Sequence, residues 1–234
     1  MRRIILIFVT LWPLSLHAEL NFNYGSGVAA KTDYAERSLI TSMEEVGDRI
    51  YAVGVHGIII FSDNKGDTWT QANYVPYQNT ITDISCSSKN MCWATGHDAT
   101  ILHSSDGGLN WVKQHDDYDF DAPLLSIHMY DDKEGIAIGA FALSLRTSNG
   151  GESWDYLFLD DDDYQPHLNY VYGDNQAWRK SAKDEGYAVG EIGKYYISDD
   201  RGLNWLVVDT GYIGSYWSGV KVDEGQSLLF GMSG

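Results

Sequence analysis

Four eight-residue stretches of one pattern recur along this chain: Ser62-Asp-Asn-Lys-Gly-Asp-Thr-Trp69, Ser104-Ser-Asp-Gly-Gly-Leu-Asn-Trp111, Thr147-Ser-Asn-Gly-Gly-Glu-Ser-Trp154 and Ser198-Asp-Asp-Arg-Gly-Leu-Asn-Trp205. Their closing tryptophans are 42, 43 and 51 residues apart. Such a period is typical of a radial array in which every unit is a small four-stranded sheet. The stretches therefore predict an all-β fold, a β-propeller of four-stranded blades.

Each stretch has the residue types of a self-contained turn. The leading Ser or Thr, and the Asp or Asn two positions later, can hydrogen-bond nearby backbone amides. The glycine in the fifth position is expected to need a positive φ, and the closing Trp to bury its ring between neighbouring sheets. These structural positions are Ser62, Gly66, Trp69, Ser104, Asp106, Gly108, Trp111, Thr147, Asn149, Gly151, Trp154, Ser198, Asp200, Gly202 and Trp205. Because the polar groups are used locally, a structural role is favoured over a calcium or sugar site in each turn.

A second repeat lies upstream of every turn. A short apolar run ends in glycine, and a small residue follows three positions later. The glycines are Gly54, Gly96, Gly139, Gly190 and Gly231. This pattern indicates a strand, a tight hairpin and another strand. One unit is therefore predicted to run through an inner strand, a second strand, a hairpin, a third strand, the Ser/Asp turn and an outer strand.

The turns resemble Asp-box (BNR) repeats, whose pattern is Ser-x-Asp-x-Gly-x-Thr-Trp. The whole unit is similar to that of the photosystem II stability/assembly factor family and its bacterial relatives, over residues 39–234. The resemblance implies a seven-bladed propeller that serves as a non-enzymatic scaffold for assembling a membrane complex. It also implies binding through an arginine-rich patch, and this chain has too few arginines to reproduce one. The scaffold role is carried over to this chain, and the family's binding residues are not.

The fifth unit is incomplete in this sequence. Residues 215–234 supply an inner strand, a second strand and the start of a hairpin. Four complete units and part of a fifth predict a fragment of a seven-bladed propeller, and closure of the ring through a partner chain is the alternative. An open propeller leaves strand edges unpaired, so edge-mediated self-association is expected.

The N-terminus has the features of a secretory signal. Arg2 and Arg3 precede an apolar stretch from Ile4 to Leu16, and Leu16-His-Ala18 fits a cleavage site. A membrane anchor is the alternative, but the stretch is shorter than the ~20 residues of a spanning helix. We therefore expect a signal peptide at 1–18, an N-terminal segment at 19–38 and the incomplete propeller at 39–234. The processed protein is then exported to the periplasm or the extracellular space, with no transmembrane span.

Two cysteines, Cys86 and Cys92, flank the predicted turn between the inner and second strands of the second unit. Export supplies an oxidising compartment, so a local disulfide is predicted. The spacing is not Cys-x-x-Cys and no clustered histidines follow, so the sequence predicts neither a metal nor a cofactor.

Charge is the main surface feature of the chain. The formal net charge of −17 argues against nucleic acid and anionic lipid as partners. Acidic and aromatic residues gather in the loops that lead from one outer strand to the next inner strand, on one face opposite the Ser/Asp turns. The aromatic residues are Tyr74, Tyr77, Tyr118, Phe120, Tyr164, Tyr212 and Tyr216. An acidic rim with exposed rings suits a basic segment of a protein partner, and a solvated surface that keeps the protein soluble is the alternative.

The unit between Trp154 and Trp205 exceeds its neighbours by eight or nine residues. The extra residues include a Trp and an Arg, types favoured at binding hot spots, although a merely decorative insertion is the alternative. The predicted partner-binding residues are Asp116, Asp117, Tyr118, Asp119, Asp160, Asp161, Asp162, Asp163 and Tyr164, together with Trp178 and Arg179 of this insertion.

A second function class is an Asp-box glycoside hydrolase, sialidase-like, or a carbohydrate-binding propeller. A sialidase needs a cluster of arginines, which this chain lacks, and the Phe/Tyr-Arg-Ile-Pro signature is absent. Other glycosidases need two positioned carboxylates. The sequence singles out no pair among the acids at the predicted inner strands, which are Glu44, Glu45, Asp83, Asp131 and Asp132. The predicted function is therefore non-enzymatic: a scaffold that binds a membrane-associated protein partner as an assembly or stability factor.

Overall fold

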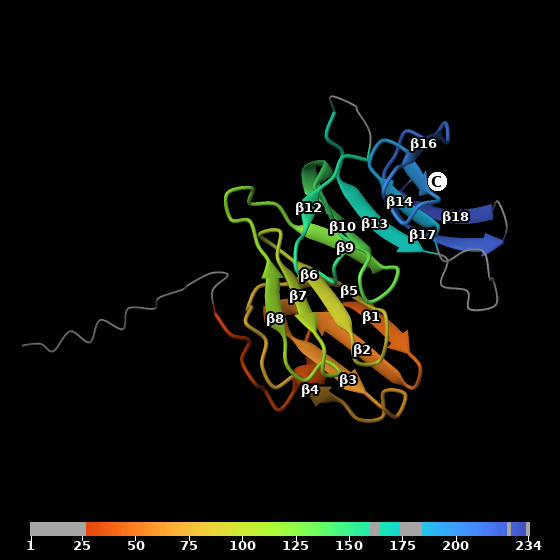
Figure 1. The fold of residues 1–234 in the computed structure, drawn as a ribbon. Coiled ribbons are helices and arrows are strands. Elements are labelled where there is room, and N and C mark those ends of the chain that lie inside the picture. The colour runs from red at the N-terminus through yellow and green to blue at the C-terminus, as the bar shows by residue number, and fades with distance from the viewer. Residues whose placement is uncertain (1–26, 160–163, 174–183, 224–225, 233–234) are drawn as a thin grey trace, which may run out of the picture.

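Four complete four-stranded sheets and one two-stranded sheet follow one another along the chain (Figure 1). The computed structural model describes residues 27–159, 164–173, 184–223 and 226–232. Each complete sheet is antiparallel, with its strands in chain order, and we call the sheets blades 1 to 5. This arrangement confirms the prediction of an all-β, partial β-propeller.

The strands have the following bounds. Blade 1 contains β1 (Ile40–Val46), β2 (Arg49–Gly54), β3 (Ile59–Ser62) and β4 (Thr70–Gln71). Blade 2 contains β5 (Ile81–Cys86), β6 (Cys92–Gly96), β7 (Ile101–Ser104) and β8 (Val112–His115). Blade 3 contains β9 (Leu124–Met129), β10 (Gly135–Gly139), β11 (Ser144–Thr147) and β12 (Asp155–Tyr156). Blade 4 contains β13 (Leu168–Gly173), β14 (Gly186–Gly190), β15 (Lys194–Ser198) and β16 (Leu206–Asp209), and blade 5 contains β17 (Tyr216–Asp223) and β18 (Gln226–Gly231).

Helical structure among the described residues is limited to three short 3-10 turns. They are η1 (Ala35–Arg37), η2 (Val55–Gly57) and η3 (Ala140–Ala142). Within the described ranges, no helix combines the length and the hydropathy required to cross a membrane.

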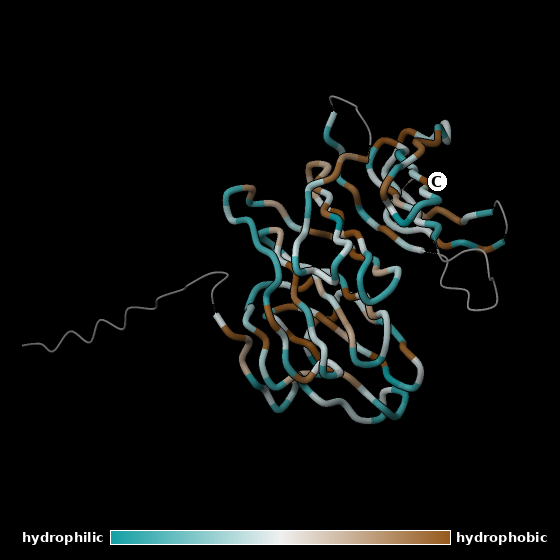
Figure 2. The backbone as a smooth tube through the Cα atoms, viewed as in Figure 1, coloured by the Kyte–Doolittle hydropathy of each residue, from teal (hydrophilic) through white to brown (hydrophobic). Residues whose placement is uncertain are grey.

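The core lies between successive blades. Figure 2 shows apolar residues along the strands and hydrophilic residues in many of the turns that join them. Trp111, Trp154 and Trp205 each pack with residues of the preceding blade, as predicted. Trp69 differs because no blade precedes blade 1 in the described part of the chain. Its half-buried ring instead packs with the small cluster that contains Ala35 of the N-terminal segment.

The inner strands share one repeated irregularity near their start. Each inner strand has a register shift one residue after its start, where a bulge leaves one residue unpaired. The bulged Thr41 donates its hydroxyl to the carbonyl of Ile81 in the next blade at 2.6 Å, and Thr82 donates to Leu124 at the same distance. These bonds join blade 1 to blade 2 and blade 2 to blade 3.

Blade 2 carries a covalent link in addition. Cys86 and Cys92 face each other across the register of β5 and β6, and a disulfide joins them. The link closes the turn between an inner strand and its neighbour.

Candidate functional site

The Asp-box turns join the third and outer strands at one end of blades 1 to 4. In blade 1, Ser62 Oγ accepts a hydrogen bond from the amide of Gly66 at 2.8 Å, and Asn64 Oδ1 accepts one from Thr68 at 2.9 Å. The same two bonds recur in the other three turns. The fifth-position glycines all have positive φ, from 75° to 91°. The hydroxyl of the first position and the side-chain oxygen of the third position are thus bonded within each turn.

Each Asp-box turn contains a second left-handed residue that the sequence pattern did not reveal. The fourth position has φ of 59° at Lys65, 78° at Gly107, 76° at Gly150 and 59° at Arg201. Glycine adopts this conformation freely, whereas Lys and Arg do so at a cost. For Arg201 the contacts of its side chain offset that cost.

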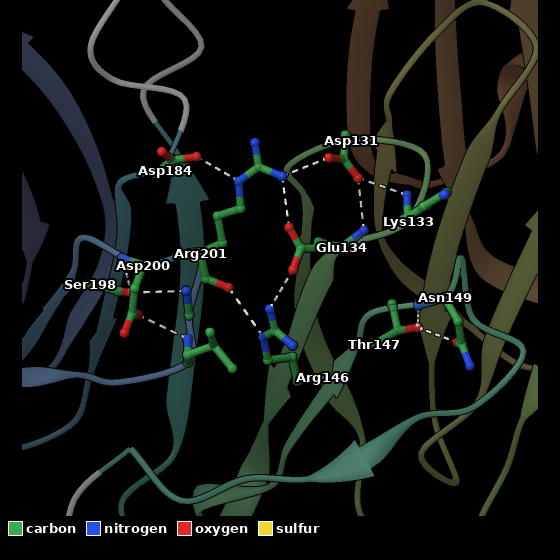
Figure 3. A network of polar contacts seen from close by, with 12 residues as sticks. Asp131, Lys133, Glu134, Arg146, Thr147, Asn149, Asp184, Ser198, Asp200 and Arg201 are labelled. Atoms are coloured by element: carbon green, nitrogen blue, oxygen red, sulfur yellow. Dashed lines mark hydrogen bonds and ion pairs between the residues drawn. The ribbon is translucent and has the colours of Figure 1, made fainter.

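Arg201 joins blades 3 and 4 through a network of ion pairs (Figure 3). Its Nη1 lies 2.7 Å from carboxylate oxygens of both Asp131 and Glu134, and its Nε lies 2.6 Å from Asp184. Glu134 also pairs with Arg146 at 2.9 Å. The carboxylate of Asp184, followed by that of Glu134, raises the pKa of the Arg201 guanidinium above its usual range.

Arg49 plays a comparable part between blades 1 and 2. Its Nε and Nη2 bind the two oxygens of Asp63 at 2.8 and 2.6 Å, and its Nη1 donates to the carbonyl of Gly107 at 2.6 Å. Arg49 and Arg201 thus pair with carboxylates at the Asp-box end, and each also links its own blade to a neighbouring one.

The opposite end of each blade is formed by the hairpin between its second and third strands and by the loop that leads to the next inner strand. One hydrogen bond recurs there: the second residue of the hairpin tip donates its amide to a carbonyl of that loop. The pairs are Gly57 to Asn79 at 2.8 Å, Ala99 to Ala122 at 2.8 Å, Ala142 to Pro166 at 2.8 Å and Gly193 to Gly214 at 2.6 Å. We call this end the hairpin face. It comprises the hairpins at 55–58, 97–100, 140–143 and 191–193 and the described parts of the loops at 72–80, 116–123, 157–167 and 210–215.

Four predicted partner-binding residues lie in the β8–β9 loop of the hairpin face. Asp116 binds Lys113 Nζ at 2.8 Å, and the hydroxyl of Tyr118 lies 2.9 Å from the same nitrogen. Asp117 Oδ1 accepts the amide of Asp119 at 3.1 Å, which closes the loop locally. The ring of Tyr118 and the side chain of Asp119 are exposed.

Asp117 also links this loop to blade 3. Its Oδ2 accepts a hydrogen bond from the hydroxyl of Tyr156 on β12. This bond lowers the pKa of Asp117 below its ordinary value, so the carboxylate stays charged. Burial and the neighbouring Asp117 raise the pKa of Tyr156 to about 12, so its hydroxyl keeps its proton. The link places the exposed ring of Phe120 6.4 Å from that of Tyr156.

The remaining predicted site residues divide into two groups. Tyr164 is described and 53% exposed. The others lie outside the described residues: Asp160, Asp161, Asp162, Asp163, Trp178 and Arg179.

The prediction of an exposed ring in every outer-to-inner loop is wrong for Tyr77 and Tyr216. Tyr77 is fully buried, and its hydroxyl donates to the carbonyl of His97 at 3.2 Å. Tyr216 is 9% exposed, and its hydroxyl bonds Thr210 at 2.9 Å. Both rings fill space between neighbouring blades, which a pattern within one unit does not show.

Sequence reasoning also missed two exposed residues at the hairpin tips, Phe141 and Ile192. They occupy the position before the small tip residue, which is His56 in blade 1 and Asp98 in blade 2. Aligning the hairpins of the four units would have shown the change from polar to apolar at this position.

A polar pocket of about 320 Å³ lies on the inner strands, where β1, β5, β9 and β13 adjoin. Among the acids considered from the sequence, the structure singles out Glu44 and Asp83. Burial raises the pKa of Glu44 to about 8 and also raises that of Asp83. His128 lines the same pocket, and burial lowers its pKa to about 4.

The contacts of these two acids are mainly with neighbouring blades. Asp83 accepts hydrogen bonds from Ser42 at 2.6 Å, Ser126 at 2.7 Å and the amide of Ile127 at 3.0 Å. Glu44 accepts the amide of Cys86 at 2.8 Å. In the part of the chain that the structure describes, no group of three or more acidic, His or Cys side chains is arranged to hold a metal ion. The acids therefore act as interblade acceptors.

The fold and these two ends define a class of protein, a β-propeller of Asp-box blades. Ion pairs link neighbouring blades at its Asp-box end, and exposed acids and aromatic rings lie on its hairpin face. The family model for photosynthesis system II assembly factor YCF48 matches residues 69–228, and the chain belongs to this family.

Two relatives illustrate the likeness. The chain is 29% identical over 110 residues to the chloroplastic photosystem II stability/assembly factor HCF136 of Arabidopsis thaliana, a match that covers 45% of this chain and 25% of that protein. It is 28% identical over 169 residues to the photosystem II assembly protein Ycf48 of Synechococcus sp. (strain JA-2-3B'a(2-13)), covering 71% of this chain and 48% of that protein. The chain thus spans between a quarter and about half of the length of these relatives.

A solved structure shows the same fold. The β-propeller domain of Cps50 (Swd1) from Myceliophteria thermophila superposes with a TM-score of 0.63 at 14% sequence identity, covering 82% of this chain and 62% of that chain. At this identity the likeness concerns the propeller architecture alone.

Proposed function

We propose that this protein is an exported, non-enzymatic propeller that binds a basic segment of a membrane-associated protein through its hairpin face, as a step in the assembly of a membrane complex. Membership of an assembly factor family supports a protein-binding assembly role. The observation that carries the proposal is the contrast between the ends of the blades. At the Asp-box end, Arg49 and Arg201 pair with neighbouring carboxylates. At the hairpin face, Asp119 and Asp121 are exposed beside the rings of Tyr118 and Phe120.

The hairpin face is suited to a basic partner for physical reasons. Exposed carboxylates steer a cationic segment toward the surface, and exposed rings supply contact area at a small cost in conformational entropy. The bond between Tyr156 and Asp117 joins the acidic loop of blade 2 to blade 3. The acidic run at 160–163 and the pair Trp178 and Arg179 are proposed as further contributors.

The names of the relatives suggest which partner to test first. Both relatives reported above are named as photosystem II assembly or stability factors. A basic segment of a photosystem II subunit is therefore the first partner that we propose to test.

Export is part of the proposal. We propose that residues 1–18 are removed as a signal peptide, that residues 19–38 lead into the propeller and that the propeller begins at residue 39. The disulfide between Cys86 and Cys92 supports this arrangement, because such bonds persist in oxidising compartments.

The test is capture of the partner from an envelope fraction at low and high salt. The Asp119→Asn/Asp121→Asn double variant should lose most of the capture at low salt, because it removes two exposed charges without changing side-chain size. The matched control is Asp67→Asn/Glu152→Gln, which removes two exposed charges from Asp-box turns. Equal loss in both variants would indicate a nonspecific effect of net charge and would contradict the proposed site.

A carbohydrate-active enzyme is the second candidate, and Glu44 beside Asp83 is the observation in its favour. A carboxyl group with a pKa of about 8 is able to act as a general acid near neutral pH. However, Ser42, Ser126 and the amide of Ile127 already bond the carboxylate of Asp83. Hydrolysis of a glycan panel by the wild type that is lost in Glu44→Gln would replace the binding proposal with this one.

A further inference from the structure

All four described hairpins of the hairpin face end in two consecutive left-handed residues. The φ values are 58° and 71° at His56 and Gly57, 58° and 49° at Asp98 and Ala99, 57° and 55° at Phe141 and Ala142, and 49° and 67° at Ile192 and Gly193. This is the backbone of a two-residue β-hairpin whose twist matches the flanking strands. The backbone is thus the same in each blade, and the side chain at the first tip position differs.

The first tip position is unfavourable for the residues of blades 3 and 4. Asp, Asn and Gly visit the left-handed region readily, whereas a bulky Phe and a β-branched Ile do so at a steric cost. Burial offsets only part of that cost, because Phe141 is 53% exposed and Ile192 is 47% exposed. Folding alone therefore does not account for these two residues, and strained positions of this kind accompany function.

Phe141 and Ile192 belong to one continuous surface. The ring of Phe141 packs edge-on against His167, with 4.9 Å between centroids. The amide of His167 donates to the carboxylate of Glu191 at 3.0 Å, and the amide of Glu191 donates to the carbonyl of His167, also at 3.0 Å. Glu191 directly precedes Ile192, so His167 and Glu191 connect the two tips across the boundary between the blades.

Other exposed apolar residues lie in the loops beside these tips. Phe158 follows β12 and is 76% exposed, and Ile213 is 88% exposed in the loop that bonds the tip of blade 4. The corresponding part of blade 2 carries Asp98, Asp119 and Asp121 instead. Among the described residues, the first tip position of the hairpin face is therefore polar in blades 1 and 2 and apolar in blades 3 and 4.

The acidic loop of blade 2 and the apolar tips of blades 3 and 4 indicate the kind of segment that binds the hairpin face. A segment with basic side chains at one end and apolar side chains at the other complements the face in charge and in hydropathy. A membrane surface fits less well, because seating the tips in a bilayer brings Asp119, Asp121 and Glu191 close to anionic headgroups.

We propose that Phe141 and Ile192 are the hydrophobic anchors of the hairpin face, and that they bind the apolar side chains of a partner peptide whose basic residues lie on the acidic loop of blade 2. This inference rests on the proposed function and specifies the segment that the site binds.

The test uses a displayed library of random 15-residue peptides. Peptides that bind the purified protein are selected and sequenced. The wild type should enrich peptides that combine Lys or Arg with Leu, Ile, Phe or Trp. The Phe141→Asn/Ile192→Asn variant should lose the apolar enrichment by at least tenfold and keep the basic enrichment. Asn tolerates the left-handed conformation, so the melting temperature of this variant should equal or exceed that of the wild type, which excludes unfolding as the cause.

Controls separate this inference from the proposed function. His56→Asn changes the same tip position in blade 1 and should leave both enrichments unchanged, whereas Asp119→Asn/Asp121→Asn should reduce the basic enrichment. If the apolar enrichment survives in Phe141→Asn/Ile192→Asn, these two residues are not the hydrophobic anchors. The proposal that the acidic loop binds basic residues is unaffected by that result. Absence of basic enrichment in the wild type overturns the proposed function. A third outcome is that the wild type sediments with phosphatidylcholine vesicles and Phe141→Asn/Ile192→Asn does not. The tips would then bind lipid, which contradicts the proposal of a peptide ligand.

Discussion

The two ends of each blade share one backbone conformation but differ in what their side chains contact. Both the Asp-box turns and the hairpin tips contain two consecutive left-handed residues. At the Asp-box end, the hydroxyl of Ser62 bonds the turn itself, and the guanidinium of Arg201 pairs with Asp131 of the preceding blade. At the hairpin end, the tip side chains Phe141 and Ile192 turn toward solvent. The motif that reveals the family is thus structural, and the binding surface that we propose lies where the repeats diverge.

The largest expected effect concerns the closing tryptophans. Trp111→Ala removes a fully buried ring between blades 1 and 2 and should lower the free energy of unfolding by about 3 to 5 kcal/mol. Trp69→Ala removes the equivalent but half-buried ring of blade 1 and should cost about 1 to 2 kcal/mol. Chemical denaturation measures both values. Equal losses would show that the turns act independently of the blade packed against them.

The next effect concerns Glu44, which lies on the inner strands, outside both the Asp-box turns and the hairpin tips. Folded Glu44 keeps its proton up to about pH 8, whereas its ordinary pKa is 4.5. The folded state therefore binds more protons in this window, and the free energy of unfolding should fall by roughly 2 to 4 kcal/mol as the pH rises through it. Glu44→Gln should remove this dependence in denaturation curves recorded from pH 5 to 8. An unchanged slope in the variant would assign the titration to another group.

A smaller effect tests whether side-chain contacts offset backbone strain at the Asp-box end. Arg201→Gly relieves the left-handed backbone but leaves Asp131, Glu134 and Asp184 without their shared cation, so it should destabilise the protein by about 1 to 2 kcal/mol. Thermal unfolding at low and high salt measures the loss, which should shrink as salt screens the network. A stabilised Arg201→Gly protein would contradict the interblade role of the arginine.

The smallest effect has the opposite sign. Lys65 occupies the same turn position as Arg201 with φ of 59° and an exposed side chain. Lys65→Gly relieves the strain and should raise the free energy of unfolding by about 0.5 kcal/mol. Comparing its melting temperature with that of Arg201→Gly isolates the contribution of the network, because the backbone change is the same.

The features that were predictable from the sequence depend on contacts between residues close in the chain. The features that were missed depend on contacts between residues far apart in the chain. The blade order was predictable because bonds such as Ser62 to Gly66 join residues four positions apart and recur as a pattern. The burial of Tyr77 depends on the fit between blades and leaves no local signature. Glu44 bonds an amide 42 residues away in the next blade, so the acid could not be distinguished from its neighbours.

The candidate site was predictable in its location and not in its full content. Acidic and aromatic residues in the outer-to-inner loops indicated the face on which to look, and the structure describes Asp116 to Asp119 there. The left-handed backbone at Phe141 and Ile192, which makes their exposure informative, required the structure itself.

Hydrogen exchange, compared between the captured complex and the free protein, locates the surface that the partner covers. Exchange should be slower in the complex at residues 116–121, 140–142 and 191–193, and unchanged in the turns at 62–69, 104–111, 147–154 and 198–205. Protection confined to those turns, with the hairpin face unchanged, would contradict the proposed binding surface.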